Sequence, residues 1–156
     1  ETPTEIPMNR LYVGGEVSQS AIVTEVRVTA HTYSTSGSGS DTVEVGGKTY
    51  YHTTAVTVKQ NPNITASTKP NVVEVKDATL VNSTNVAAVT QHVFDYYMRR
   101  QTHSVQIVMD KELPGDYVDT TTPWDDHITG TITSMTIKLS GIAAAECDIV
   151  GMGASA

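Results

Sequence analysis

The chain of 156 residues has little cysteine, few aromatic residues and little charge. Its single cysteine, Cys147, excludes an intramolecular disulfide framework and a zinc site built from cysteines. Charged residues make up 17% of the chain and aromatic residues 6%. The longest apolar run, from Gly141 to Ala145, is far shorter than the roughly 20 residues that a membrane-spanning helix needs.

Positive charge is also scarce, with 10 Lys and Arg against 17 Asp and Glu and a net charge of −7. No basic cluster is longer than the pair Arg99 and Arg100. The basic footprint of a nucleic-acid-binding protein is therefore missing. The same shortage removes electrostatic attraction to an anionic membrane. We expect neither nucleic acid nor membrane as a partner.

Threonine and valine are abundant, with 24 and 20 residues respectively. Both are β-branched, and such residues favour the pleated, half-buried surface of a sheet over a helix. The length is sufficient for one domain with its own core. Because the chain begins at Glu1 rather than at methionine, we expect a processed chain or part of a longer polypeptide.

The hydrophobic pattern predicts an α+β fold that is mainly β, with antiparallel sheets and one amphipathic helix packed on them. The helix is expected over about 84–100, with Asn82 or Ser83 as its N-cap and Arg99 and Arg100 in its last turn. Its predicted apolar face carries Val86, Val89, Val93 and Tyr97. Strands are expected over 21–33, 42–45, 48–58, 72–75, 105–109, 116–119, 128–139 and 143–150.

For domain organisation we expect an extended lead-in over 1–19, a single β-rich domain over 20–152 and a tail over 153–156. An exposed hairpin insertion is expected at about 34–50, because a Ser/Gly-rich stretch without apolar residues precedes two strands joined by Gly46 and Gly47.

Three residues of the second half are expected to hold shape rather than to carry chemistry. Gly115 and Asp116 follow Pro114 in a predicted tight turn, and Gly130 is expected to open the strand that continues to Leu139. The alternation of apolar residues in that strand slips by one position, which predicts a bulge near Thr133 and Ser134.

The sequence contains no specific catalytic or metal-binding motif. The acidic residues between Asp110 and Asp126 lack the spacing of a calcium loop, and the five histidines do not show metal-ligand spacing. Cys147 lies in a predicted strand, where nothing stabilises a thiolate. We expect no enzyme, no metal and no cofactor; a hydrolase would require His103 and His127 to meet beside the acidic turn.

The second half contains an ordered series of short motifs. The predicted helix ends in Tyr-Tyr-Met-Arg-Arg, and the segments 105–109, 112–118 and 130–141 follow it at fixed spacing. In this order they resemble baseplate hub and tail-tip proteins of bacteriophages, particularly those from prophages of gut bacteria. Segments 26–33, 47–54 and 77–81 are also similar to those proteins, so that the resemblance covers about residues 23–151.

This resemblance implies a non-enzymatic structural domain of a phage or prophage tail protein. Such a domain acts by assembling with copies of itself and with neighbouring tail proteins, and would be found in the virion tail after assembly in the bacterial cytoplasm. Uncharged, Thr-rich strands suit such interfaces, because their burial between subunits requires no desolvation of charge.

A second hypothesis is a β-rich adhesion or carbohydrate-binding module. Trp124, beside Asp125 and Asp126, is the feature that favours it, since an exposed aromatic ring stacks on sugars and carboxylates bond to their hydroxyls. Its ligand would be a glycan on the host surface.

Overall fold

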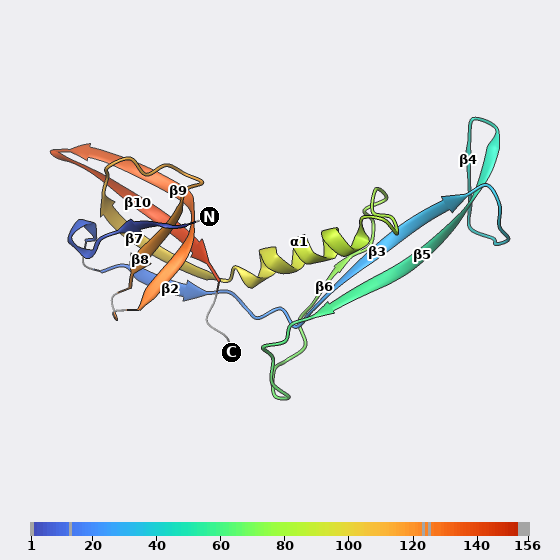
Figure 1. The fold of residues 1–156 in the computed structure, drawn as a ribbon, viewed down its shortest axis with the longest axis horizontal. Helices are drawn as coiled ribbons and strands as arrows, with labels where there is room; N and C mark the ends of the chain where they lie inside the picture. The colour runs from blue at the N-terminus through green and yellow to red at the C-terminus, as the bar shows by residue number, and fades with distance from the viewer. Residues whose placement is uncertain (1, 13, 123, 125, 153–156) are drawn as a thin grey trace. The chain divides into compact units, whose positions relative to one another are not determined.

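The structure, a computed structural model, describes residues 2–12, 14–122, 124 and 126–152. These residues pack into two compact units, each built around its own sheet. The six-stranded unit combines the segment up to Ala21 with the segment from Met98 onward, and the four-stranded unit is residues 22–97 (Figure 1).

The six-stranded unit is one mixed sheet in the order β1-β8-β9-β10-β7-β2. Neighbouring strands are antiparallel except β1 and β8, which are parallel. The strands are β1 (Thr4–Ile6), β2 (Glu16–Gln19), β7 (Gln101–Val108), β8 (Tyr117–Thr121), β9 (His127–Ser140) and β10 (Ile142–Gly151).

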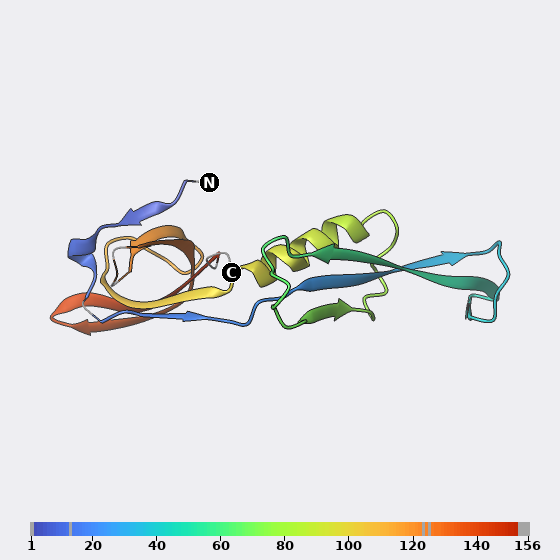
Figure 2. The same cartoon turned by 90° about the horizontal axis from the view of Figure 1, so that it is seen from below.

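Alternating residues of these strands form the core of the six-stranded unit. In β7, for example, His103, Val105 and Ile107 are buried while the residues between them are half-buried. The sheet curves around one apolar cluster, as Figure 2 shows. The buried members of this cluster are Ile6, Val105, Ile107, Val118, Ile128, Ile132, Ala145, Cys147 and Ile149.

The N-terminal segment supplies both edges of this sheet, although the sequence predicted only an extended lead-in. A 3-10 turn, η1 (Met8–Arg10), follows β1, and β2 then pairs with β7 on the far edge. The strands are three and four residues long, too short for a period-2 pattern to reveal them. Their pairing depends on β7 and β8, which lie about a hundred positions away in the chain.

The predicted bulge in β9 is confirmed, and the prediction for Gly130 is wrong. Ser134 pairs with Asp148 and Ile132 with Ile149, so that Thr133 is the extra residue. Gly130 does not open the strand, because β9 begins three residues earlier and is already paired with β8 there. Gly130 instead lies opposite Gly151 inside the β9–β10 ladder.

The four-stranded unit has the strand order β4-β5-β3-β6. Val26, Val28 and Ala30 are buried on one face, which confirms the alternation seen in the sequence. Gly46 and Gly47 both have positive φ, 58° and 74°, and form the expected two-residue hairpin turn. The strands are β3 (Glu25–Ser34), β4 (Thr42–Val45), β5 (Lys48–Gln60) and β6 (Val72–Val75).

The helix α1 (Val86–Met98) runs along this sheet (Figures 1 and 2). Asn82 caps the turn over residues 83–85 that leads into the helix, because its Oδ1 accepts from the amide of Thr84 at 2.9 Å and of Asn85 at 3.3 Å. The ammonium group of Lys59 lies 4.9 Å from the ring centre of Phe94, which joins the helix to β5.

Two details of the helix differ from the prediction. Its fully buried residues are Thr90 and Phe94, whereas Val86, Val89 and Val93 are only half-buried and Tyr97 is exposed. Phe94 is the one phenylalanine of the chain and a large apolar side chain. The helix therefore packs on the sheet with the face that carries Phe94. The helix also ends at Met98, so that Arg99 and Arg100 follow it rather than belong to its last turn.

The fold is thus α+β and mainly β, as the sequence predicted, with α1 as the α-helix of the described residues. The division into a lead-in over 1–19, one domain over 20–152 and a tail over 153–156 stays a prediction.

Candidate functional site

The tip of the β9–β10 hairpin carries an apolar surface that the six-stranded unit does not cover. Ile137 is 52% exposed and Leu139 83% exposed, and Ala143, which pairs with Leu139, is exposed as well. We call these three residues the apolar hairpin face. Gly141, with φ of 90°, makes the turn at the end of the hairpin.

The apolar hairpin face continues the core of the unit. Ile137 pairs with the fully buried Ala145, and two residues further along Met135 pairs with the buried Cys147. Side chains two apart on a strand share a face, so that one apolar row runs from the core into solvent. The core ends at Ala145 on this face, so the exposed Ile137 and Leu139 add little to the packing of the unit itself.

The opposite face of the hairpin is polar on β9, whereas on β10 it also carries the exposed Ile142 near the turn and the buried Ala144. Lys138 forms an ion pair with Glu146, and Thr136 lies beside them as the residue paired with Glu146. The apolar hairpin face is therefore buried only near the base of the hairpin, and apolar side chains are exposed toward its tip. Such a pattern is typical of a surface that contacts another molecule.

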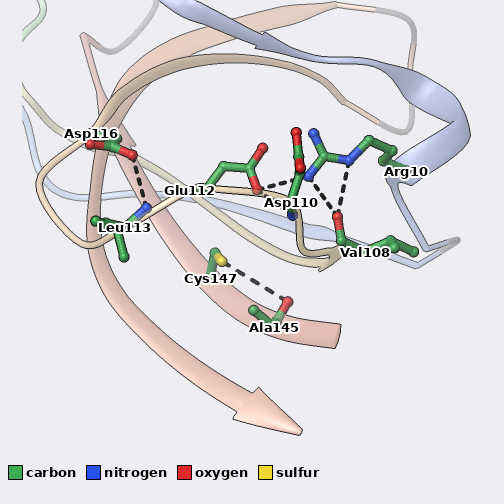
Figure 3. Close-up of polar contacts among 8 residues, drawn as sticks. All are labelled: Arg10, Val108, Asp110, Glu112, Leu113, Asp116, Ala145 and Cys147. Carbon is green, nitrogen blue, oxygen red and sulfur yellow. Dashed lines mark hydrogen bonds and ion pairs between the residues drawn. The ribbon is translucent and has the colours of Figure 1, made fainter. Parts of the chain in front are cut away.

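A partly buried ion pair ties the N-terminal segment to the end of β7, where Val108 pairs with Ala144 near the tip of the hairpin. The Arg10 guanidinium donates to Oε2 of Glu112 at 2.7 Å and to the carbonyl of Val108 at 2.7 and 3.0 Å (Figure 3). Burial alone would raise the pKa of Glu112, but hydrogen bonds from Arg10 and from the amide of Asp110 outweigh it and lower the pKa to about 2. The pair holds the segment between β1 and β2 against the end of β7.

A polar groove lies on the other side of β7 and β10. Asp148 lines it and accepts hydrogen bonds from the hydroxyls of Ser104 at 2.6 Å and Ser134 at 2.7 Å, which lower its pKa. Cys147, next to Asp148 on β10, has its side chain in the core cluster, and burial raises the pKa of its thiol to about 11. The thiol therefore stays protonated near neutral pH and is no nucleophile.

Gly115, Asp116 and Gly130 lie around the start of β8. Gly115, with φ of 100°, forms the turn into β8, and its amide donates to the carbonyl of Ile132 at 2.8 Å. Oδ2 of Asp116 accepts from the amide of Leu113 at 2.8 Å and closes this turn. Gly115 and Gly130 line one shallow depression, with Tyr117 beside them.

Trp124 and Asp126 lie at the opposite end of β8, in the turn to β9. The Trp124 side chain is 69% exposed, and the amides of Trp124 and Asp126 both bond to the hydroxyl of Thr122. Asp125 lies outside the described residues. The five candidates that the structure describes therefore do not gather into one site, and the roles of all six stay predictions.

The histidines required for a hydrolase are not brought together. His103 is buried and its Nδ1 lies 2.9 Å from the hydroxyl of Thr120, on the core side of β8. His127 is exposed and contacts Asp119, on the outer side of β8. The strand separates the two rings. Glu112 and Asp116 are engaged in the contacts given above, and among the described residues no group of three or more His, Cys, Asp or Glu can hold a metal ion.

The sequence alone does not distinguish the apolar hairpin face from the rest of the predicted strand over 128–139. The available signal was the uninterrupted alternation of Met135, Ile137 and Leu139, facing Ala143 and Ala145 across the turn. A pattern of this kind shows which side chains share a face, but only the tertiary structure shows where the core ends.

No family model matches the chain, and no curated protein matches it. In the described part of the chain, no helix is both long and apolar enough to cross a membrane.

Solved structures do match. A chain of the virion of a native gene transfer agent particle aligns with a TM-score of 0.56 and 12% identity, over 97% of this chain and 32% of that one. A tail protein from Neisseria meningitidis gives a TM-score of 0.58 at 10% identity, over 95% of this chain and 43% of its own. The 43 kDa tail protein of prophage MuSo2 from Shewanella oneidensis gives 0.57 at 10% identity, over 96% and 43%.

The chain spans from 32% to 43% of the length of these three protein chains. At such low identity the likeness concerns the fold, and it gives no support to the carbohydrate-binding alternative. The resemblance read from the motifs is confirmed at this level, whereas the gut-bacterial origin and the position in a baseplate or tail tip stay predictions. This chain shares its fold with part of the Neisseria meningitidis tail protein and part of the MuSo2 prophage tail protein.

Proposed function

We propose that this chain is a non-enzymatic structural domain of a phage or prophage tail-tip or baseplate protein, and that it acts by assembly with itself and with neighbouring tail proteins. The proposal is supported by the fold shared with two tail proteins and a virion chain. It places the chain in the virion tail, after assembly in the bacterial cytoplasm.

The observation that carries the proposal is the apolar hairpin face. Ile137 and Leu139 extend the core row of the sheet into solvent, and burial of an apolar side chain stabilises a contact by about 1.5–3 kcal/mol. In the proposed assembly, a copy of this chain or a neighbouring tail protein covers this surface. A monomer that worked alone would leave it exposed at a cost in solubility.

The test is the assembly of the full-length protein with its co-encoded tail proteins. We expect the wild type to self-associate in gel filtration with light scattering, or to co-purify with a co-encoded tail protein. The double variant I137T/L139T places a β-branched residue at both positions of the strand and removes the apolar surface, so it should lose this association. Both side chains are exposed, and the unfolding temperature should therefore stay close to that of the wild type.

The matched control is Lys138→Thr, on the polar face of the same strand, where the exposed ion pair with Glu146 contributes at most about 1 kcal/mol. This variant should associate like the wild type. A strictly monomeric wild type at high concentration that binds no co-encoded tail protein would overturn the proposed function. If the control and the double variant associate equally well, the apolar hairpin face is not the surface through which the protein assembles.

A further inference from the structure

The strand β5 has a paired strand on only one of its two sides beyond His52. On the inner side, residues 51–60 pair with β3 without a break. On the outer side, β4 covers residues 48–51, and the amide of His52 then donates to the carbonyl of Asp41 at 2.9 Å (Figure 1). In the described part of the chain no strand pairs with the outer side of residues 53–60. We call these eight residues the free β5 edge.

The free β5 edge presents a row of backbone hydrogen-bonding groups to the outside. The amide of His52 points outward, and this direction alternates from residue to residue along a strand. Because the β3–β5 register has no break, the N–H and C=O groups of every second residue after His52 also point outward, at Thr54, Val56, Val58 and Gln60. The chemical group that complements such a row is the backbone of another extended strand.

The free β5 edge has none of the features that usually prevent a strand edge from pairing. Natural edges are short, bent by a bulge, interrupted by proline or marked by charge. This segment is Thr-Thr-Ala-Val-Thr-Val-Lys-Gln, without proline or glycine, and its register with β3 has no bulge. Its one charged residue is Lys59, whose ammonium group contacts Gln91 and the ring of Phe94 on α1. The edge is therefore long, regular and almost free of charge.

Two exposed valines lie along this edge, on the face of the sheet that α1 does not cover. Lys59 pairs with the buried Val26 and contacts Phe94, so its side chain lies on the helix side. Side chains alternate between the two faces, so Val56 and Val58 lie on the other face, where they are 58% and 49% exposed. A strand that paired here would place its own side chains beside these valines and reduce their contact with water.

We propose that the free β5 edge pairs antiparallel with the same edge of a second copy of this chain, about a twofold axis beside Thr57. In this register Val56 lies opposite Val58 of the second copy, and Val58 opposite its Val56. The outward backbone groups of both residues exchange hydrogen bonds across the axis. A register centred on residue 56 would instead place Val58 opposite Thr54 and leave one contact between valines.

The second copy is the partner that fits, because the segment complements itself. Thr54 lies opposite Gln60 of the second copy, so that all outward groups of the edge find partners. Lys59 lies opposite Ala55, and like charges therefore do not meet. Self-complementarity of this kind is what a twofold contact between identical subunits requires. The inference rests on the self-assembly proposed above and assigns to it a second surface, separate from the apolar hairpin face.

Thr57→Cys in the full-length protein tests the register by cross-linking. The two copies of residue 57 would face each other with Cα atoms about 4.5 Å apart, within the range of roughly 4.4–6.8 Å that a disulfide spans. Thr53→Cys is the matched control on the same side of the strand, because its two copies would lie about 26 Å apart. Under mild oxidation, non-reducing gels should show the covalent dimer forming about tenfold faster in Thr57→Cys. The native Cys147 is buried. Both variants carry I137T/L139T, so that the apolar hairpin face does not contribute.

Val56→Lys, in the same I137T/L139T protein, tests the strength of the contact. The exposed side chain leaves the melting temperature unchanged, but a lysine on this edge should raise the dimer dissociation constant about tenfold in analytical ultracentrifugation. Val45→Lys, at an exposed valine of β4 outside the free β5 edge, should dimerise like the parent. An unchanged dimer in Val56→Lys, or equal cross-linking of the two cysteine variants, would overturn the edge contact. Neither outcome affects the association through the apolar hairpin face, which is measured separately with Lys138→Thr as its control.

Discussion

The guanidinium of Arg10 and the carboxylate of Glu112 lie 2.7 Å apart although 102 positions separate them in the chain. The Glu112 side chain is only 2% exposed, and one of its oxygens, Oε1, has no hydrogen-bond partner among the described residues. A buried carboxylate in this position is tolerated because Arg10 compensates its charge. The contact connects the segment between β1 and β2 to the residues that follow β7, in the middle of the sequence of the six-stranded unit.

Replacing Arg10 by methionine should therefore destabilise the protein strongly. The variant keeps an aliphatic stem but leaves the carboxylate of Glu112 buried without its cation, at an expected cost of about 3 kcal/mol in the free energy of unfolding. Urea unfolding at pH 7 measures this. The control Lys138→Ala breaks the exposed pair with Glu146 and should cost less than about 1 kcal/mol. Equal losses in the free energy of unfolding in the two variants would contradict the conclusion that burial of Glu112 makes its pair with Arg10 the more important one.

The same carboxylate predicts a loss of stability in acid. Its pKa is about 2 in the folded protein, below the value of about 4.3 in an unfolded chain, so the unfolded state binds the proton more readily. The stabilisation is complete above about pH 5 and is lost as the pH falls toward 2, with a total of roughly 3 kcal/mol. Urea unfolding from pH 7 to pH 2 measures it. In Glu112→Gln this part of the pH dependence should disappear.

Gly130 should not tolerate a side chain. A Cβ atom at Gly130 would lie 2.6 Å from the carbonyl oxygen of Val150, a backbone atom that cannot move without disturbing the β9–β10 ladder. We expect Gly130→Ala to lower the free energy of unfolding by about 1–3 kcal/mol. Gly39→Ala is the control, because no atom lies within 4 Å of its Cβ position. Thermal unfolding distinguishes the two, and an unchanged melting temperature for Gly130→Ala would contradict the close contact.

Cys147 should be unreactive in the folded protein. Its side chain is 2% exposed and burial raises its pKa to about 11, so that thiolate is scarce at neutral pH. Iodoacetamide at pH 7.5 should label the thiol only after denaturant is added, as followed by mass spectrometry. Rapid labelling without denaturant, at a rate similar to that of free cysteine, would show that the core around β10 opens.

The local pattern of residues predicted those parts of the fold that depend on near neighbours. The alternation of Val26, Val28 and Ala30, the turn at Gly46 and Gly47 and the bulge at Thr133 are all present, because each follows from backbone conformation and from the spacing of side chains along one strand. The helix was also predicted, although its buried face centres on Thr90 and Phe94. The position of a helix face depends on the sheet beneath it.

The scarcity of cysteine, aromatic residues and charge, together with abundant threonine and valine, determined by itself that this chain is mainly β and lacks a disulfide framework. Only the tertiary structure decided that the N-terminal segment forms both edges of a sheet and that Arg10 meets Glu112. It also decided which apolar residues lie beyond the core, at Ile137 and Leu139. The physical reason is that strand pairing and burial depend on contacts between distant residues, which no local pattern specifies.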